Sequence, residues 1–244
     1  MAEREAAIEG LRKIGQAAVP ALVHIIPKKM TDQIIALKRI GYPANAEAIP
    51  YLVEELKYAG SYPPKEAEIV EALILIGIPA IEELHQAIMS QAKNGLMINH
   101  IAEILLTFEA PSIGCLMPTL IHALKAGLDY DPWYYRGLME LIEKIGSPLA
   151  EAAIPILCDY CSRPFSAGVP SKLDPGSVEE FMEKAREANE EVKESALCSL
   201  SAFSSNALSS VLPTIDAATR DPSDRIRYAA IALAERIRSD ADLK

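Results

Sequence analysis

The residues that could do chemistry are few, and their spacing matches no catalytic motif. Cys158 and Cys161 form one Cys-x-x-Cys pair. On a helix this spacing places both thiols on one face, where they could bind a metal or form a redox pair. A structural zinc site needs four ligands, and the chain has no second pair, so two buried core cysteines are the favoured interpretation. Cys115 and Cys198 lie among apolar residues and are interpreted in the same way.

The histidines do not form a metal motif. His24, His85, His100 and His122 are neither followed by Glu nor spaced four residues apart. A Gly-rich phosphate loop and a Gly-x-Ser-x-Gly turn are also missing. We therefore expect no cofactor, no metal and no catalytic residue, and predict that the protein is not an enzyme.

An aromatic cluster is better suited to binding than to catalysis. Trp133, Tyr134, Tyr135 and Arg136 follow Asp131–Pro132, a typical N-cap and first residue of a helix. Three consecutive rings at a helix start point in different directions, so not all of them can be buried in one stripe. Trp, Tyr and Arg dominate binding energy at protein interfaces, which makes the exposed members candidate partner-binding residues. The alternative is that the rings pack between neighbouring helices.

An acidic segment is the second candidate surface. Residues 163–188 begin as a Pro/Gly/Ser loop and are predicted to continue as a charged helix from about Gly176. A solvated helix face is the simpler interpretation, and a docking surface for a basic partner is the alternative. The carboxylates assigned to that surface are Glu179, Glu180, Glu183 and Glu187.

A group of tyrosines allows the same two interpretations. Tyr42, Tyr51, Tyr58 and Tyr62 lie within 21 residues of one another. Packing in the core or against a connection is favoured over binding.

A repeat must position these residues. In each of six copies an apolar pair or Ile-Gly ends one helical stretch, a short connection follows, and a proline opens the next stretch. Gly suits the left-handed conformation after a helix, and Pro costs least in the first turn of a helix. Strand-like alternation is missing throughout, so the pattern predicts an all-α fold without β-sheet. The helix-ending positions are Gly15, Gly41, Gly77, Glu109, Gly146 and Ser204.

The last copy resembles the HEAT repeat. Its sequence, VLPTIDAATRDPSDRIRYAAIALAERI, has Leu-Pro, then Asp-Pro, then Arg and an Ala-rich second helix in the HEAT order. In HEAT repeats the Asp and the following Arg, here Asp221 and Arg227, commonly interact between neighbouring units. The resemblance implies a right-handed α-solenoid of about six to seven HEAT-like helical pairs. It would form one domain over residues 1–244, with the segment at about 163–188 inserted.

In such a stack the second helix of each pair lines the concave surface. The resemblance assigns this surface to residues 46–58, 80–91, 114–125 and 149–162. A weaker likeness covers residues 25–56, which are similar to a short bacterial domain family of unknown function through a Pro-Lys, an Asp, Gly-Tyr-Pro and Pro-Tyr-Leu.

Charge and composition bound the partners. The chain has 34 acidic and 24 basic side chains and a net charge of -10, which repels phosphate, so we expect no nucleic acid. Its N-terminus is charged where a secretory signal would be apolar, and no apolar run is long enough to cross a membrane. Four cysteines are too sparse for a disulfide framework. These features predict a cytoplasmic protein.

The expected function is that of a non-enzymatic HEAT-like scaffold that binds another protein. A basic partner is favoured, and an immunity-type protein that neutralises a cationic toxin is the sharper version. The alternative is an enzyme or lyase subunit of the HEAT-like class whose active residues are scattered over several repeats. The oligomeric state is not predicted.

Overall fold

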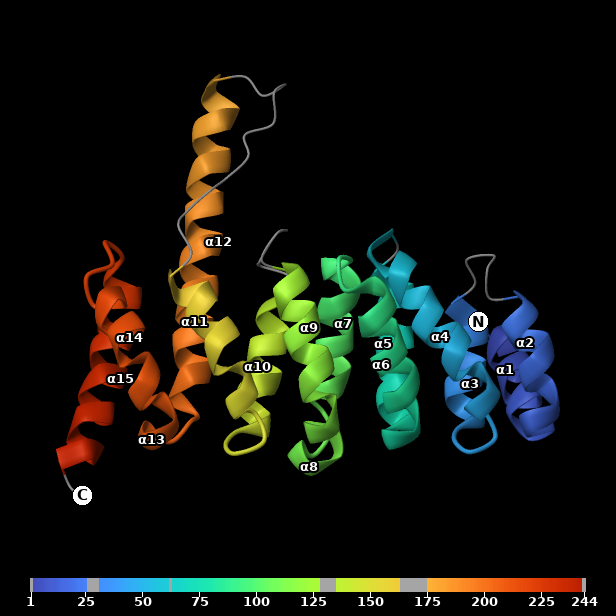
Figure 1. The fold of residues 1–244 in the computed structure, drawn as a ribbon. Coiled ribbons are helices and arrows are strands. Elements are labelled where there is room, and N and C mark those ends of the chain that lie inside the picture. The colour runs from blue at the N-terminus through green and yellow to red at the C-terminus, as the bar shows by residue number, and fades with distance from the viewer. Residues whose placement is uncertain (1, 26–30, 62, 128–134, 163–174, 243–244) are drawn as a thin grey trace. The chain divides into compact units, whose positions relative to one another are not determined.

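The computed structural model describes residues 2–25, 31–61, 63–127, 135–162 and 175–242, and all of its regular structure over these ranges is helical (Figure 1). The prediction of an all-α fold is therefore confirmed there. The chain divides into two compact units, Met1–Thr119 and Leu120–Lys244. The single solenoid domain over residues 1–244 stays a prediction.

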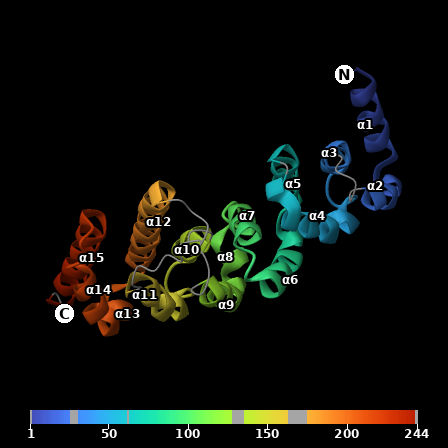
Figure 2. The same ribbon diagram turned by 90° about the horizontal axis from the view of Figure 1, so that it is seen from above.

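In the first unit the helices form two layers (Figure 2). One layer, the first-helix layer, consists of helices that pack against one another in chain order: α1 (Ala2–Ile14), α3 (Thr31–Ile40), α5 (Pro63–Ile76) and α7 (Gly95–Leu105). The other layer, the second-helix layer, consists of α2 (Val19–Ile25), α4 (Ile49–Glu55) and α6 (Ile81–Gln91). In this layer α4 packs against α6, and α2 contacts the 3-10 turn that precedes α4. The unit also contains α8 (Ala110–Ile113), and α9 (Met117–Gly127) starts within it.

The second unit is built in the same manner. Its helices α10 (Arg136–Ile145), α12 (Pro175–Ser201) and α15 (Asp224–Asp242) lie side by side. On one side of them α11 (Ile154–Ser162) packs against α14 (Leu212–Ala218), and α13 (Ser205–Leu208) is a short helix against α15. Aliphatic side chains from these helices and three fully buried large rings, Tyr135, Tyr160 and Phe203, form the core.

The sequence repeat corresponds to a repeated local structure. Each second helix is entered through a short 3-10 turn, and the proline lies in or next to the first turn, as in α4 and α14. Four helix-ending glycines have a positive φ, which confirms the prediction made from their type. At Gly77 and Gly146 the ψ angles are -143° and -179°, in a region that is essentially open to glycine alone.

The two copies of the repeat that lack glycine at the helix-ending position have a different turn. Glu109 and Ser204 have extended backbones, with φ and ψ of -66° and 141°, and of -65° and 147°. Each serves as the N-cap of a one-turn helix, α8 or α13, and the Ser204 hydroxyl accepts a hydrogen bond from the Ala207 N–H at 3.3 Å. An L-residue at this position thus replaces the glycine turn by an extra helical turn.

The predicted inserted helix is the beginning of a longer one. A charged helix does begin near Gly176, but α12 starts at Pro175 and continues without a break to Ser201. Its residues 183–191 are exposed or half-buried, whereas the apolar stripe from Val192 to Leu200 is buried. The charged segment is therefore the N-terminal extension of a core helix. Residues 163–174 of the predicted loop lie outside the described residues.

The expected contact between Asp221 and Arg227 has a different form. Arg227 donates to the backbone carbonyl of Asp221 at 3.1 Å and pairs with Asp224, all within one copy. The Asp221 carboxylate instead accepts from Lys193 Nζ on α12 at 2.9 Å. Both side chains of this second pair are about seven-eighths buried, at 13% and 12% exposure. Lys193 therefore links α12 to the turn before α15.

Candidate functional site

Two exposed tyrosines mark the second-helix layer of the first unit. Tyr51 on α4 and Tyr58 on the following 3-10 turn (Leu56–Ser61) are 45% and 60% exposed. Glu54, between them, is also exposed and pairs with Lys57 at 2.5 Å. The spacing of three and four residues places all three side chains on one face, opposite buried Leu52. The favoured interpretation, that these tyrosines are packed residues, is therefore wrong for Tyr51 and Tyr58. It is also wrong for Tyr42, which is 51% exposed. Tyr62 lies outside the described residues.

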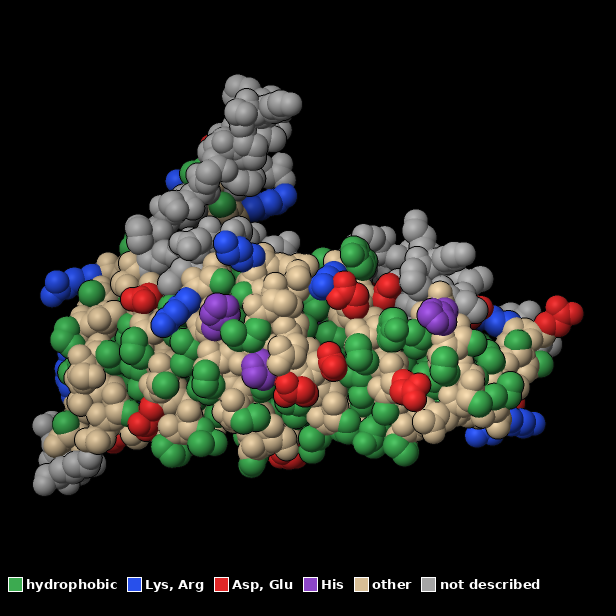
Figure 3. Space-filling model, turned by 45° about the vertical axis from the view of Figure 1, so that its right-hand side comes forward, with side chains coloured by type: hydrophobic (Ala, Val, Ile, Leu, Met, Phe, Trp, Pro, Cys, Tyr) green, Lys and Arg blue, Asp and Glu red, His purple; other side chains and the backbone are tan. Residues whose placement is uncertain are grey.

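Helix α6 extends this surface, because it packs directly against α4. It adds Met89, 45% exposed, and the exposed carboxylate of Glu82, which accepts a hydrogen bond from Gln86 at 3.0 Å. Figure 3 shows apolar and acidic side chains lying intermixed on the surface of the protein. We call the surface formed by Tyr51, Glu54, Tyr58, Glu82 and Met89 the tyrosine face.

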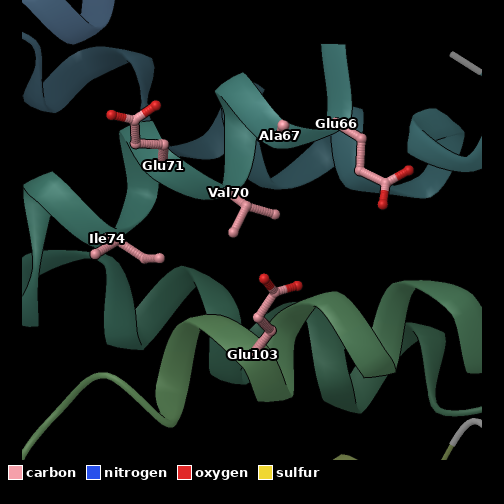
Figure 4. Close-up of a pocket in the computed structure, with 6 residues that line it drawn as sticks. All are labelled: Glu66, Ala67, Val70, Glu71, Ile74 and Glu103. Atoms are coloured by element: carbon pink, nitrogen blue, oxygen red, sulfur yellow. The ribbon is translucent and has the colours of Figure 1, made fainter. Parts of the chain in front are cut away.

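A pocket of about 340 Å³ lies in the first-helix layer of the same unit (Figure 4). Glu103 reaches from α7 toward α5, where Val70 points into the gap and Glu66 and Glu71 stand to either side. Ala67 and Ile74 complete the described lining, which is apolar at its centre and carries three carboxylates. Of the described side chains that line it, none is basic.

A groove of about 470 Å³ in the second unit contains one of the predicted site residues, Arg136. Arg136 is exposed, donates to Glu140 at 3.1 Å and lies 3.7 Å from Glu191 of α12. Arg225 of α15 pairs with Glu194. Positive and negative charges alternate here, so the groove is less selective for a basic partner than the pocket. The lining consists of Arg136, Glu140, Glu143, Glu191, Glu194, Ser195, Cys198 and Arg225.

Tyr135 is not available as an anchor. It is fully buried, and its ring lies so close to Gly127 that a Cβ built on that glycine would be 2.6 Å from it. This member of the aromatic cluster therefore follows the alternative interpretation, in which a ring packs between helices, and its assignment to the binding surface is corrected. Trp133 and Tyr134 lie outside the described residues.

The acidic residues of α12 are only partly brought to a site. Glu179, Glu183 and Glu187 are exposed, as a solvated face requires, and the side chain of Glu180 is not among those described. The carboxylates that meet a cation from another helix are Glu191 and Glu194, further along the same helix. Their charge and helical spacing were visible in the sequence, but the identity of their neighbours on α10 and α15 was not.

The cysteines do not form a reactive pair. Cys158 and Cys161 are buried, as predicted, whereas Cys115 and Cys198 are exposed, which corrects their interpretation as core residues. Burial, with a smaller contribution from Asp159, raises the pKa of Cys158 to about 11, and burial also raises the pKa of Cys161. Cys198 is exposed, yet partial desolvation of its sulfur, together with Glu194 and Glu143, raises its pKa too.

We expect Cys115 to be the first thiol modified by iodoacetamide at neutral pH. The thiolate is the reacting form, and a pKa raised from 9.0 to about 11 lowers its fraction at Cys158 by about a hundred-fold, in addition to the protection by burial. The rate at Cys158 should rise as the pH approaches 11. Peptide mass spectrometry over time would show the order of modification. Early modification of Cys158 at neutral pH would contradict it.

Within the described ranges, no three His, Cys, Asp or Glu side chains are grouped so that they could hold a metal ion, and no helix is both long and apolar enough to span a bilayer. Comparison of the chain with protein-family models, curated proteins and solved structures finds no match. The function is therefore argued from the surfaces described above.

Proposed function

We propose that the protein is a non-enzymatic, HEAT-like α-solenoid scaffold that binds a basic protein partner through the tyrosine face. The observation that carries this proposal is the pair of exposed tyrosines, Tyr51 and Tyr58, on either side of the exposed carboxylate of Glu54. A sharper version is an immunity-type protein that neutralises a cationic toxin.

The chemistry of this face fits lysine and arginine side chains. A tyrosine ring attracts a cation through its negatively charged face, and the Glu54 carboxylate supplies a hydrogen-bond acceptor that a partner's cation would share with Lys57. Tyrosine also contributes a large contact area at low cost in side-chain entropy, which is why it is frequent among the residues that dominate interfaces. Met89 adds an adaptable apolar side chain on α6, the helix that packs against α4.

The net charge of -10 supports a basic partner through long-range attraction, since complementary charge speeds the encounter of two proteins. The order of helix contacts within each unit supports the solenoid. In the first unit the first helices α1, α3, α5 and α7 contact one another in sequence, and α4 contacts α6. This is the arrangement in which each helical pair buries its apolar face against the next pair.

The proposal is tested by placing a photo-crosslinking amino acid at Tyr58 in the native host. A stoichiometric crosslink to a basic protein is the expected result. Tyr228, which is 66% exposed on α15, provides a matched control position and should give no such product. A crosslink to an acidic protein, or equal products at both positions, would argue against the tyrosine face.

The affinity for the crosslinked partner gives a second readout. Replacing Tyr51 and Tyr58 together with alanine should weaken binding by about a hundred-fold, because two aromatic anchors are removed. Both rings are largely exposed, so the thermal midpoint should change little. Tyr228→Ala, the matched control, should leave both quantities unchanged. Undiminished binding by the double variant would sink the proposal.

A further inference from the structure

Ion pairs connect successive helices of the first-helix layer. Between α1 and α3, Arg4 pairs with Asp32 and Arg39 pairs with Glu5, at 2.5 and 2.7 Å. Between α3 and α5, Lys38 pairs with Glu68 and Glu71, at 2.6 and 2.7 Å. At these two interfaces each carboxylate named here faces a basic side chain of the neighbouring helix.

The next interface, between α5 and α7, breaks this pattern. Glu66 and Glu71 of α5 and Glu103 of α7 surround the pocket shown in Figure 4, and no described basic side chain lines it. Lys38 is already shared between Glu68 and Glu71. Glu103 has no ion-pair partner among the described residues. Glu71 is thus paired with Lys38, whereas no described basic side chain balances the charge of Glu103, and an added cation would do so.

His100 provides a second, independent indication of an incomplete site. It is 4% exposed, and its Nε2 lies 3.3 Å from Oε1 of Glu66 at the rim of the pocket. Neither of its ring nitrogens has a hydrogen-bond partner among the described residues. Buried polar groups are nearly always hydrogen-bonded, so an unsatisfied imidazole directed at a pocket carboxylate points to a missing group.

The shape of the pocket indicates the kind of cation. Its carboxylates do not converge closely enough to form a metal-binding group within the described part of the chain. They are instead spread around a space of about 340 Å³ whose centre is lined by Ala67, Val70 and Ile74. An alkyl chain can cover such an apolar strip while its charged end reaches the carboxylates.

We propose that this pocket binds an alkylammonium or guanidinium group, supplied by a free polyamine or by a lysine or arginine side chain. The site lies on α5 and α7 and is distinct from the tyrosine face on α4 and α6. Glu103 and Glu66 accept hydrogen bonds from the cationic head, and the methylene groups of the ligand lie over Val70 and Ile74.

The test is calorimetric titration of the whole chain with two probes at moderate salt: spermidine, and a blocked tripeptide with one central arginine. Binding of either probe supports the site, and the stronger of the two identifies the source of the cation. Glu103→Gln and Glu66→Gln should each weaken that probe by about ten-fold, because a charge-assisted hydrogen bond is lost. Glu47→Gln removes the same charge from an exposed position outside the pocket and should have little effect.

Several outcomes would overturn the site. Failure of both probes to bind at millimolar concentration would do so, as would equal weakening by Glu47→Gln and Glu103→Gln, which would indicate a bulk charge effect. If magnesium raised the thermal midpoint as much as the better probe does, this would also argue against an organic cation. The variant with alanine at Tyr51 and Tyr58 should bind the probe with unchanged affinity. The proposal for the pocket and the proposal for the tyrosine face can therefore be refuted separately.

A readout without ligand accompanies these titrations. Glu103→Gln should raise the thermal midpoint of the free protein, because it removes a charge that no described cation balances. The better probe should raise the midpoint of the wild type more than that of the variant. A fall in the midpoint of the free variant would show that Glu103 has a stabilising partner and would overturn the idea of a missing cation.

Discussion

Replacing Tyr135 with alanine is expected to lower the free energy of unfolding of the second unit by about 3–5 kcal/mol, the usual cost of removing a large buried ring. Tyr135 is fully buried and its ring packs directly on Gly127, the last residue of α9. Chemical denaturation followed by circular dichroism would measure the loss.

The neighbouring residue supplies the control for this experiment. Arg136 is exposed, so Arg136→Ala should change the free energy of unfolding by less than about 1 kcal/mol. Gly127→Ala should resemble Tyr135→Ala in direction, because its added methyl group would meet the ring at 2.6 Å. A Tyr135→Ala protein with unchanged stability and weakened partner binding would restore Tyr135 as an anchor.

Replacing Lys193 with methionine is expected to lower the free energy of unfolding of the second unit by about 2–4 kcal/mol, somewhat less than for a fully buried pair. The Asp221 carboxylate, 12% exposed, would lose its cation and retain a hydrogen bond from the Ser223 N–H at 3.0 Å. Because Lys193 joins α12 to the turn before α15, we expect the loss to appear as earlier unfolding of that turn in hydrogen exchange.

An exposed pair nearby shows whether burial is responsible. Arg225 of α15 pairs with Glu194 of α12, but their side chains are 58% and 31% exposed. Arg225→Met should therefore cost less than about 1 kcal/mol. The double variant Lys193→Met with Asp221→Asn should recover part of the loss, since no unpaired charge remains. Equal losses for Lys193→Met and Arg225→Met would contradict the argument from burial.

The candidate binding residues were only partly predictable. The sequence pointed to aromatic and acidic residues, and the structure places Tyr51, Tyr58 and Glu54 together on one face of α4 and the turn after it. It also buries Tyr135, which the sequence assigned to binding. Residue type alone does not distinguish these tyrosines, because a tyrosine ring is stable both in a core and at an interface.

The fold class followed from short-range physics that a sequence displays directly. Glycine at positions such as Gly77 and Gly146 permits a backbone conformation closed to other residues, and proline is tolerated at a helix start, so the ends of the helices could be located from residue types. Apolar spacing then identified the helices between them.

Long-range neighbours were decided only by the tertiary structure. Three features depend on which helices lie side by side. Helix α12 continues from its charged start into the core, and Lys193 pairs with Asp221. The described lining of the pocket between α5 and α7 contains no basic side chain. Residues up to 37 positions apart meet there, and the sequence contains no local signal of such contacts. Burial and the balance of charge are properties of the packed helices, so they appear only once the packing is known.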